Sequence, residues 1–414
     1  MTNSLYYSYV VLNKVYGEGK FIKQAINDAF IEEAHRAFTV KVCYGVLDRD
    51  AELSYYIKSL AKKSPKLPVR TILKISMYAI KYLDKKDYFI VESAVELTKK
   101  LGKQGASGFV NAFLRKFVSA KIPLPTDEIL NLSVKYSYPE FAVKELINDY
   151  GKARAESIMS AKYPANTLCF YGTDGEKYLK ERGADFSLTP FGNVFAVRNF
   201  HRNADYDKGV YTYQVLGSVA ICDAVSPCDK LLDCCAAPGG KSVRLSYKVG
   251  EVTAWDVHPH RTELIKEYAR RMGRTNIDVS VRDAKEFDGR WENYFDAVLC
   301  DAPCSGFGVV GDNPDIKINR SEKDVASLIE EQSRILDTVS RYVKKGGYLY
   351  YSTCSVFFGE NIGVINGFLS KNSDFALTEA DSPLKHELIG KTLAFLPDIS
   401  DGNGFYLAKL KRIK

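Results

Sequence analysis

Several features are scarce or missing in this chain of 414 residues. No run of 18 or more apolar residues occurs, which excludes a membrane-spanning helix. The N-terminus has no charged segment followed by an apolar one, so no secretory signal is expected. The nine cysteines are an odd number and Cys234 adjoins Cys235, which is not a disulfide framework. We therefore expect reduced thiols in a cytoplasmic protein and, without paired CxxC units, no metal site.

The composition is that of a folded protein, with 46% hydrophobic and 26% charged residues, which excludes a disordered chain. The net charge of +7 is unevenly distributed. Residues 1–205 contain 31 Lys and Arg against 22 Asp and Glu, whereas residues 206–414 contain 27 against 29. Such a one-sided basic excess is typical of an RNA or DNA binder, although any single cluster could be a solvated helix face. The excess peaks at Lys58, Lys62, Lys63, Lys66 and Arg70.

The first part of the chain is predicted to be all helical. Apolar residues recur at helical spacing over residues 6–120, and Pro68–Leu83 is apolar almost all round, which predicts a central helix. Two prolines in 121–126 indicate a linker, so a first helical domain is placed at 1–121. Residues 122–205 are mixed and predict a small α+β domain. Its expected elements are a helix at Phe141–Tyr150 and strands at Thr167–Tyr171 and Val194–Asn199.

After residue 205, short apolar runs alternate with helical stretches. This alternation predicts an α/β Rossmann-like domain over 206–414, with a mostly parallel sheet and helices on both faces. The expected strands are Lys230–Asp233, Glu251–Asp256, Asp278–Val281, Ala297–Asp301 and Tyr348–Ser352.

A loop of small residues follows the first of these strands. The strand ends at Asp233, and a helix is expected to begin near Lys241. Gly239 and Gly240 allow close approach of a ligand, and a helix start offers free N–H groups. The spacing matches neither GxGxxG nor GxxxxGK[ST], so a pyrophosphate is not the first choice of ligand. The alternative is a plain strand–turn–helix corner.

Two further carboxylates stand at the next strand ends. Asp256 comes 23 positions after Asp233 and suits the hydroxyls of a ribose, while Asp283 could accept from an adenine amino group. Each Asp alone could cap a helix. The series at successive strand ends favours adenosine with a tail that is not a phosphate, which predicts S-adenosylmethionine.

Two thiols, Cys304 and Cys354, fall at carboxyl ends of later strands, beside Asp301. Carbon 5 of cytosine becomes nucleophilic when a thiolate adds to carbon 6, after which the carbon 5 proton must be removed. That chemistry needs a thiolate, an acid near ring nitrogen 3 and a base, and these three side chains supply those types. The other thiols, Cys43, Cys169, Cys222, Cys228, Cys234 and Cys300, are expected to be buried and inert, and the His258/His260 pair to lie in a surface loop.

These motifs resemble the RsmB/Sun family of bacterial 16S rRNA cytosine-C5 methyltransferases, within the RNA m5C methyltransferases. The residues that carry the resemblance are Asp-Cys-Cys-Ala-Ala-Pro-Gly-Gly-Lys at 233–241, Asp-Ala-Pro-Cys-Ser-Gly at 301–306, Asn-Pro-Asp-Ile-Lys at 313–317, Ser-Thr-Cys-Ser at 352–355 and the segment 404–410. Residues 91–96 and 110–115 are similar to the NusB-like helical domain of that family. Gln214-Val215, where the family more often has Gln-Asp, and residues 163–166, which lack its Pro-Pro and Arg, depart from the pattern.

The resemblance assigns a role to each matching position. Cys354 would be the nucleophile and Cys304 the thiol that removes the proton and releases product. Asp301 would contact both the cofactor and the cytosine ring. Lys241 would balance the charge of that carboxylate or lower the pKa of the thiol; the alternative is that it is simply a solvated side chain at the start of a helix. The residues implied to bind S-adenosylmethionine are Cys235, Ala236, Ala237, Pro238, Gly239, Gly240, Lys241, Asp256, Asp283 and Asp301.

The expected partner is small-subunit rRNA, naked or in an early assembly intermediate, bound by a monomer without membrane or metal. Two alternatives stay open at this point. One is the same chemistry on tRNA, and the other is a non-catalytic NusB-like RNA-binding assembly factor. The helical first domain favours rRNA only by analogy.

Overall fold

The computed structural model describes residues 2–161, 166–400 and 402–414. Its contacts divide the chain into two compact units. The first comprises Met1–Ser160 with Val310–Glu322, and the second Ala161–Val309 with Lys323–Lys414. Of the departures from the family pattern noted above, residues 163–165 lie outside the described part of the chain. No helix within the described ranges is long and apolar enough to cross a membrane.

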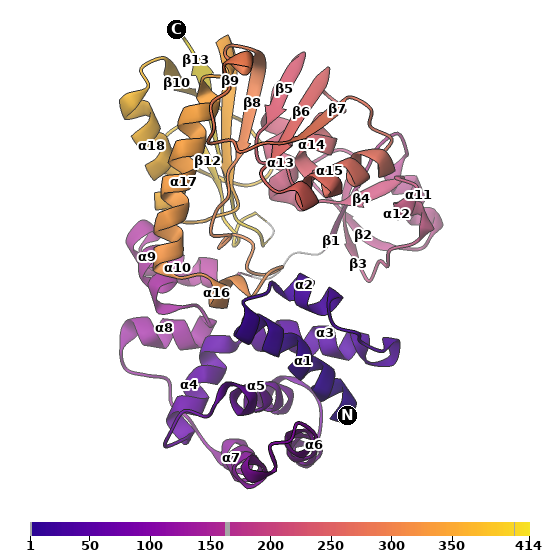
Figure 1. Cartoon of the computed structure of the whole chain (residues 1–414), viewed down its shortest axis with the longest axis vertical. Helices are drawn as coiled ribbons and strands as arrows, with labels where there is room; N and C mark the ends of the chain where they lie inside the picture. Colours follow the sequence, from indigo (N-terminus) through magenta and orange to yellow (C-terminus); the bar gives the residue numbers. More distant parts are fainter. Residues whose placement is uncertain (1, 162–165, 401) are drawn as a thin grey trace. The chain divides into compact units, whose positions relative to one another are not determined.

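The described residues of the first unit are helical, as predicted for residues 1–121 (Figure 1). Residues 122–160, predicted as part of a small α+β domain, also form helices and pack with this unit, and only the strands from residue 166 onward belong to the second unit. Its α-helices are α1 (Thr2–Glu18), α2 (Ile22–Asn27), α3 (Glu33–Asp48), α4 (Asp50–Leu60), α5 (Leu67–Tyr82), α6 (Asp87–Lys100), α7 (Ser107–Ser119), α8 (Glu128–Tyr136), α9 (Glu140–Tyr150), α10 (Lys152–Met159) and α16 (Ile316–Asn319).

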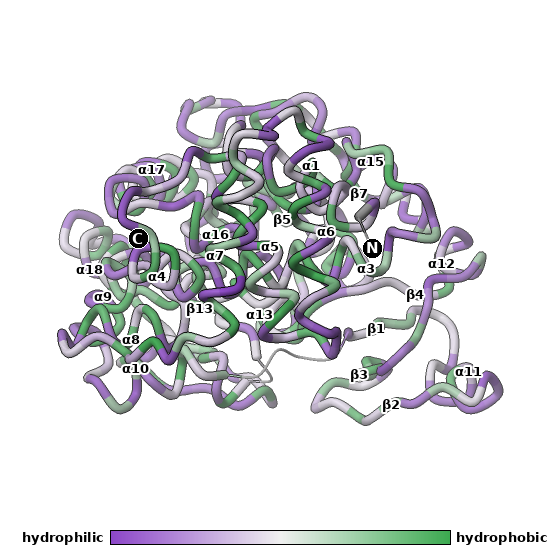
Figure 2. The backbone as a smooth tube through the Cα atoms, turned by 90° about the horizontal axis from the view of Figure 1, so that it is seen from below, coloured by the Kyte–Doolittle hydropathy of each residue, from purple (hydrophilic) through white to green (hydrophobic). Residues whose placement is uncertain are grey.

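Helix α5 is the centre of this unit, which confirms the prediction for Pro68–Leu83. It packs against α1, α3, α4, α6 and α7. Residues 71–77 are all buried, so the helix is covered on every side. Close approach of α3 requires Gly45, because a Cβ there would lie 2.0 Å from the Tyr78 ring. In Figure 2 the tube of α5 carries long green stretches, whereas α11 (Gly175–Glu181) is mostly purple.

A short segment from late in the chain completes the helical unit. Lys317 on α16 has a side chain only 3% exposed and pairs with Asp48 at the end of α3, with Nζ 2.7 Å from the carboxylate. Asp315 accepts a hydrogen bond from the backbone N–H of Ile22. Ile318 packs against the core of the unit. Residues 310–322 therefore belong structurally with the helices, although the chain reaches them only after most of the sheet is built.

The second unit contains two sheets. The strands are β1 (Asn166–Phe170), β2 (Asp185–Leu188), β3 (Val194–Arg198), β4 (Tyr211–Tyr213), β5 (Lys230–Asp233), β6 (Glu251–Asp256), β7 (Ile277–Val281), β8 (Phe295–Asp301), β9 (Val343–Thr353), β10 (Phe375–Thr378), β11 (Glu387–Ile389), β12 (Thr392–Phe395) and β13 (Phe405–Arg412). The α-helices besides α11 are α12 (Ala204–Asp207), α13 (Leu216–Ala224), α14 (Gly240–Leu245), α15 (Pro259–Arg271), α17 (Glu322–Ser340) and α18 (Ile362–Lys371).

The larger sheet has the order β11-β12-β13-β9-β8-β5-β6-β7, with β10 beside β13. Strands β5 to β9 pair in parallel, whereas β13 runs antiparallel to β9. Leu231 and Leu232 point to opposite faces of β5 and join two separate cores. Helices α13, α14 and α15 cover one face, and α17 and α18 cover the other. This confirms the predicted Rossmann-like architecture with helices on both faces. The sheet is mixed rather than mostly parallel, because β10, β11, β12 and β13 pair antiparallel.

The smaller sheet is antiparallel, with the order β2-β3-β1-β4. The ring of Tyr171, just after β1, stacks on Tyr247 beyond α14, with centroids 4.2 Å apart. Arg271 of α15 donates hydrogen bonds to the carbonyl of Tyr211 and to the hydroxyl of Thr212 on β4. The small sheet is therefore held against the helices that follow β5 and β6.

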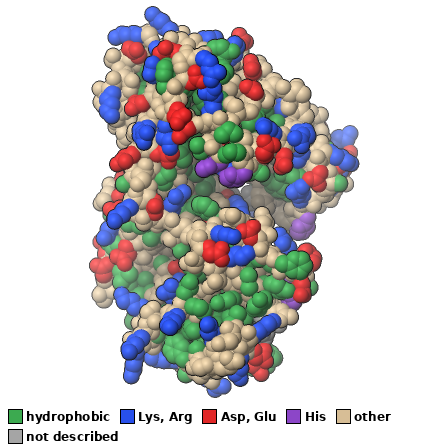
Figure 3. Space-filling view, viewed as in Figure 1, with side chains coloured by type: hydrophobic (Ala, Val, Ile, Leu, Met, Phe, Trp, Pro, Cys, Tyr) green, Lys and Arg blue, Asp and Glu red, His purple; other side chains and the backbone are tan. Residues whose placement is uncertain are grey.

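The surface of the helical unit carries both apolar and basic groups. Tyr88, Phe89, Phe109 and Val118 of α6 and α7 are exposed. In Figure 3 green side chains gather over the lower half of the view, and Lys and Arg side chains line its lower margin. Of the basic peak predicted from the sequence, residues 58, 62, 63 and 66 are exposed around the turn between α4 and α5, and Arg70 is half-buried.

The buried pair between Asp48 and Lys317 leads to a stability prediction. Asp48→Ala leaves the buried ammonium without its carboxylate, so the free energy of unfolding should fall by about 3–5 kcal/mol. Lys317→Met, of similar volume, should cost far less. Urea unfolding followed by far-UV circular dichroism measures both variants, while the fluorescence of Trp255 and Trp291 reports the second unit separately. A more damaging Lys317→Met would contradict this account of the pair.

Candidate active site

The predicted site residues meet at the carboxyl edge of the parallel strands. Strands β5, β6, β8 and β9 end at or next to Asp233, Asp256, Asp301 and Cys354. A cavity of about 320 Å³ opens at this edge. Of the residues predicted from the sequence, its lining includes Cys235, Ala237, Asp256, Asp283, Asp301, Cys304 and Cys354. The described lining does not include Ala236, Pro238, Gly239, Gly240 or Lys241, although Lys241 contacts the lining residue Asp301.

The loop after β5 is held by its own ends. Gly239 has a φ of +104° and caps α14, and a Cβ there would lie 3.1 Å from the Cα of Ile265. The Ser242 hydroxyl donates to Asp233 at 2.6 Å, which ties the start of α14 to the end of β5. Burial raises the pKa of Asp233 to about 7, the Ser242 hydrogen bond opposes this, and the nearby Asp301 adds to it. Asp233 is therefore a buried support of the loop.

Asp256 lies in the wall of the cavity and does not cap α15. The N-cap of α15 is His258, whose backbone N–H donates to Asp256 Oδ1 at 3.0 Å. Arg261 lies with Nη1 3.5 Å from Asp256 Oδ2, and its Nη2 donates to the carbonyl of Ala237 at 3.2 Å. Arg261 thus joins the loop after β5 to the end of β6, a role that the sequence analysis missed.

The charges around the cavity fit a ligand with hydroxyl and amino groups. Each cation in the described lining is within 4 Å of a carboxylate: Arg261 of Asp256, Arg282 of Asp288, and Lys285 of Asp283 and Glu331. A phosphate tail would need donors that are not already engaged. Carboxylates at successive strand ends can instead accept from a ribose and from an amino group. The donor set therefore supports adenosine without a phosphate tail.

Asp301 is held from both sides. Lys241 Nζ lies 2.6 Å from Asp301 Oδ2, and the Ser352 hydroxyl donates to Asp301 Oδ1 at 2.7 Å. Burial lowers the pKa of Lys241, but the Asp301 carboxylate outweighs burial and raises it well above its usual range. Lys241 is therefore a fixed ammonium that balances Asp301, the first of the roles considered for it.

The two predicted thiols lie side by side. Cys304 Sγ and Cys354 Sγ are 3.2 Å apart, although 50 residues separate them in the chain. Both are half-buried and line the cavity. The hydrogen bond with Cys354, followed by burial, raises the pKa of Cys304 well above its usual range. A second thiolate within this pair is therefore strongly disfavoured.

Of the six cysteines expected to be buried, Cys228 is half-buried and the other five are buried, and Cys234 and Cys235 line the same cavity as the thiol pair. Burial raises the pKa of Cys169 and Cys222 to about 12 and that of Cys228 to about 11. All nine thiols are free. His258 and His260 are exposed, as expected, but they stand at the start of α15 rather than in a loop, with ring centroids 5.6 Å apart, and His258 also lines the cavity. Among the described residues no cluster of three or more His, Cys, Asp or Glu side chains could hold a metal.

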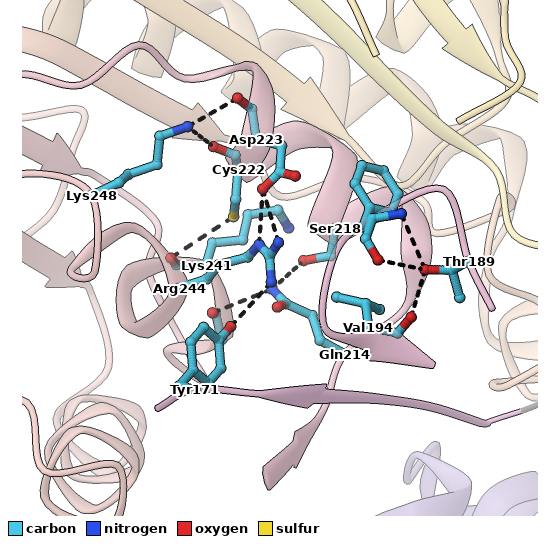
Figure 4. A network of polar contacts seen from close by, with 12 residues as sticks. Tyr171, Thr189, Val194, Gln214, Ser218, Cys222, Asp223, Lys241, Arg244 and Lys248 are labelled. Atoms are coloured by element: carbon cyan, nitrogen blue, oxygen red, sulfur yellow. Dashed lines mark hydrogen bonds and ion pairs between the residues drawn. The ribbon is translucent and has the colours of Figure 1, made fainter. Parts of the chain in front are cut away.

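A polar network supports the loop from behind (Figure 4). Gln214, after β4, donates from Nε2 to the carbonyl of Gly240 at 3.3 Å and to Ser218 Oγ at 3.0 Å. Arg244 of α14 donates to the Tyr171 hydroxyl at 3.2 Å and to Asp223 at 2.9 Å. The position that departs from the family, Val215, is the N-cap of α13 and makes no side-chain cap bond. The small sheet thus fixes α14 without using that position.

A larger groove of about 870 Å³ lies between α6 and α7 in the helical unit. Its described lining includes Tyr88, Val91, Arg115 and Val118 but no cysteine. The reactive side chains gather instead in the smaller cavity at the sheet edge, which is therefore the candidate active site.

Comparisons with known proteins agree with both units. Residues 221–411 match the family model for the 16S rRNA methyltransferases RsmB/F, and residues 4–119 match the NusB family. The chain is 32% identical over 426 residues to the probable ribosomal RNA small subunit methyltransferase B of Bacillus subtilis, covering 94% of each. It is 28% identical over 422 residues to ribosomal RNA small subunit methyltransferase B of Photorhabdus laumondii, covering 97% of this chain and 96% of the relative.

Solved structures share the fold. The crystal structure of PH0851 superposes with a TM-score of 0.84 at 22% identity, covering 99% of this chain and 98% of that one. A methyltransferase homologue from Pyrococcus horikoshii gives a TM-score of 0.60 at 24% identity and covers 70% of this chain and all of its own. At these identities the likeness bears on the fold alone.

The raised pKa of Cys304 predicts how this thiol reacts. Only the thiolate is alkylated, so at pH 8 iodoacetamide should modify Cys304 at least about tenfold more slowly than free cysteine. Cys354→Ala removes the largest cause of the raised pKa, so it should speed this modification. Mass spectrometry of peptides measures the rate, with the buried Cys222 as internal control. An unchanged rate in Cys354→Ala would show that the two sulfurs are not coupled.

Proposed function

Because the chain belongs to the RsmB/F family of 16S rRNA methyltransferases, we propose that it methylates carbon 5 of a cytosine in small-subunit rRNA through a covalent bond to Cys354. The chain is an S-adenosylmethionine-dependent rRNA methyltransferase, and the fold is the one that such enzymes share. The observation that carries the finer proposal is the pair of thiols, 3.2 Å apart in the wall of the cavity.

The cavity residues divide into groups for the cofactor and groups for the base. S-adenosylmethionine supplies a methyl group on a sulfonium when bound. Asp256 is proposed to accept from its ribose hydroxyls and Asp283 from its adenine amino group, beside the loop Cys235–Lys241. Asp301 lines the same cavity as Asp256, Asp283 and the two thiols.

Cys354 is the proposed nucleophile. Its thiolate adds to carbon 6 of the cytosine, while Asp301 carries the proton that ring nitrogen 3 gains. Carbon 5 is thereby made an enamine carbon and takes the methyl group, and the bond from that methyl group to sulfur breaks. Lys241 Nζ, 2.6 Å from Asp301, stabilises the carboxylate that is left when the Asp301 proton passes to nitrogen 3.

Cys304 is the proposed base of the second half of the reaction. It takes the proton from carbon 5, and the electron pair left behind restores the double bond between carbons 5 and 6. That bond expels Cys354 as a thiolate, and nitrogen 3 gives back its proton. The product is 5-methylcytosine with both thiols free of RNA.

The two alternatives from the sequence are less well supported. A non-catalytic assembly factor has no need of two adjacent thiols in a cavity lined by four carboxylates. A tRNA substrate is not indicated by the relatives, whose names specify small-subunit rRNA. RNA docking on residues 1–121 is proposed from the basic excess there and the NusB match. The monomeric state and the cytoplasmic location stay predictions.

The order of steps separates the two thiols. Cys354→Ala should give neither methylation nor an RNA adduct, because no bond to carbon 6 can form. Cys304→Ala should still attack and methylate and then accumulate as a covalent protein–RNA complex. A denaturing gel with 16S rRNA transcript should show a slow, RNase-sensitive band for Cys304→Ala only. The band in Cys354→Ala instead would reverse the roles, and full activity of both variants would refute the covalent mechanism.

The cofactor assignment is tested at Asp256. Asp256→Asn removes the charge of the proposed ribose acceptor, so S-adenosylmethionine binding should weaken by about 1.5–3 kcal/mol, roughly 10- to 150-fold in Kd. Isothermal calorimetry measures the affinity. Asp278→Asn, an exposed residue on the next strand, is the matched control and should bind normally. Equal affinities of the two variants would remove Asp256 from the site.

A further inference from the structure

A buried carboxylate joins the two thiol loops from beneath. Glu360, in the turn after β9, has no exposed surface. Its Oε2 accepts hydrogen bonds from the hydroxyls of Ser305 and Ser355, both at 2.5 Å. Its Oε1 accepts from the backbone N–H of Ser305 at 2.7 Å and from Gln332 Nε2 at 3.0 Å. Ser305 directly follows Cys304 and Ser355 directly follows Cys354, so one carboxylate holds both loops.

The surroundings of Glu360 reinforce this clamp. Gln332 also donates to the carbonyl of Pro303, the residue before Cys304. Asn361, next to Glu360, accepts from the Thr353 hydroxyl and donates to the carbonyl of Ser355. The residues on both sides of each thiol are therefore tied to the pair Glu360–Asn361.

The carboxylate is buried without a counter-charge. Within the described part of the chain no Lys, Arg or His forms a salt bridge with Glu360, and four donated hydrogen bonds hold it instead. A buried charge without a cation is costly unless hydrogen bonds replace its water. A fold that needed only to fill this space would use an apolar side chain, so the charge itself calls for an explanation.

We propose that Glu360 is the positioning residue of the two-thiol centre, fixing the distance between Cys304 and Cys354 and directing the single thiolate of the pair to Cys354. The proposal rests on the proposed function. A negative charge beneath both loops disfavours a second anion, and the Glu360 charge adds to the hydrogen bond with Cys354 and to burial in raising the pKa of Cys304.

This arrangement orders the reaction. Before attack, one proton leaves the pair to solvent, and the Cys354 thiolate accepts a hydrogen bond from the Cys304 thiol. When Cys354 has bonded to carbon 6, its negative charge is gone and the largest cause of the raised pKa of Cys304 disappears. Cys304 can then release its own proton to solvent and accept the one from carbon 5. Glu360 acts through both thiols without touching the base.

The test compares Glu360→Gln, which removes the charge, with Glu360→Asp, which keeps it but shortens the side chain. In a Cys304→Ala background, Glu360→Gln should form the RNA adduct about 10- to 100-fold more slowly, with S-adenosylmethionine affinity unchanged within twofold. With both thiols present, Glu360→Gln should also raise the rate of Cys304 alkylation at pH 8 relative to Cys354. Glu360→Asp should slow the adduct while preserving that alkylation preference, which a merely structural role would not predict.

Glu330→Gln on α17, an exposed glutamate two residues from Gln332, is the matched control and should behave as the parent. If Glu360→Gln does not fold, Ser355→Ala should slow the adduct and Ser305→Ala should slow product release. Parent-like rates and parent-like alkylation preference in the Glu360 or serine variants would overturn the proposal alone. Absence of any adduct in Cys304→Ala with Glu360 intact would instead overturn the proposed function.

Discussion

Strand β5 pairs in parallel with β6 on one side and with β8 on the other, so the connections after these strands leave the sheet in opposite directions. This divergence opens the crevice in which every reactive group lies. The loop after β5 goes to one face with α14, and the loop after β8 carries Cys304 toward β9. The rest of the site depends on that topology, because side chains far apart in the sequence meet only where strand ends meet.

Within the crevice, the ionisable side chains lie so close together that the protonation of one affects the protonation of its neighbours. Asp301 forms an ion pair with Lys241, and Cys304 and Cys354 are hydrogen-bonded to each other through their sulfurs. Burial raises the pKa of Asp233, the nearby Asp301 raises it further, and the hydrogen bond from Ser242 opposes both. Asp301, Lys241 and the two thiols are thus electrostatically coupled. Because the cavity is partly buried, each of their interactions is stronger than it would be in water.

The sequence predicted the elements whose pattern is local. The helices of the first unit and the strands that end at Asp256 and Asp301 were readable because apolar periodicity and strand-end loops are short-range signals. Arg261 could have been found, since it lies one turn into the helix after β6 and so returns to the same edge. Glu360 could not have been found from the sequence, because its hydrogen bonds come from serines on two loops that only the fold brings together. For the same reason nothing in the sequence marked residues 310–322 as part of the helical unit.

The contribution of residues 310–322 to the helical unit has a consequence for how the protein is made. The chain is synthesised from its N-terminus, and the helices α1 to α10 leave the ribosome first. Their surface at Asp48 and Ile22 stays without Lys317 and Asp315 until the ribosome has passed residue 322 and most of the parallel sheet has emerged. The final closure of the first unit is therefore a late event in translation, and a nascent chain halted before that residue carries an incomplete helical unit.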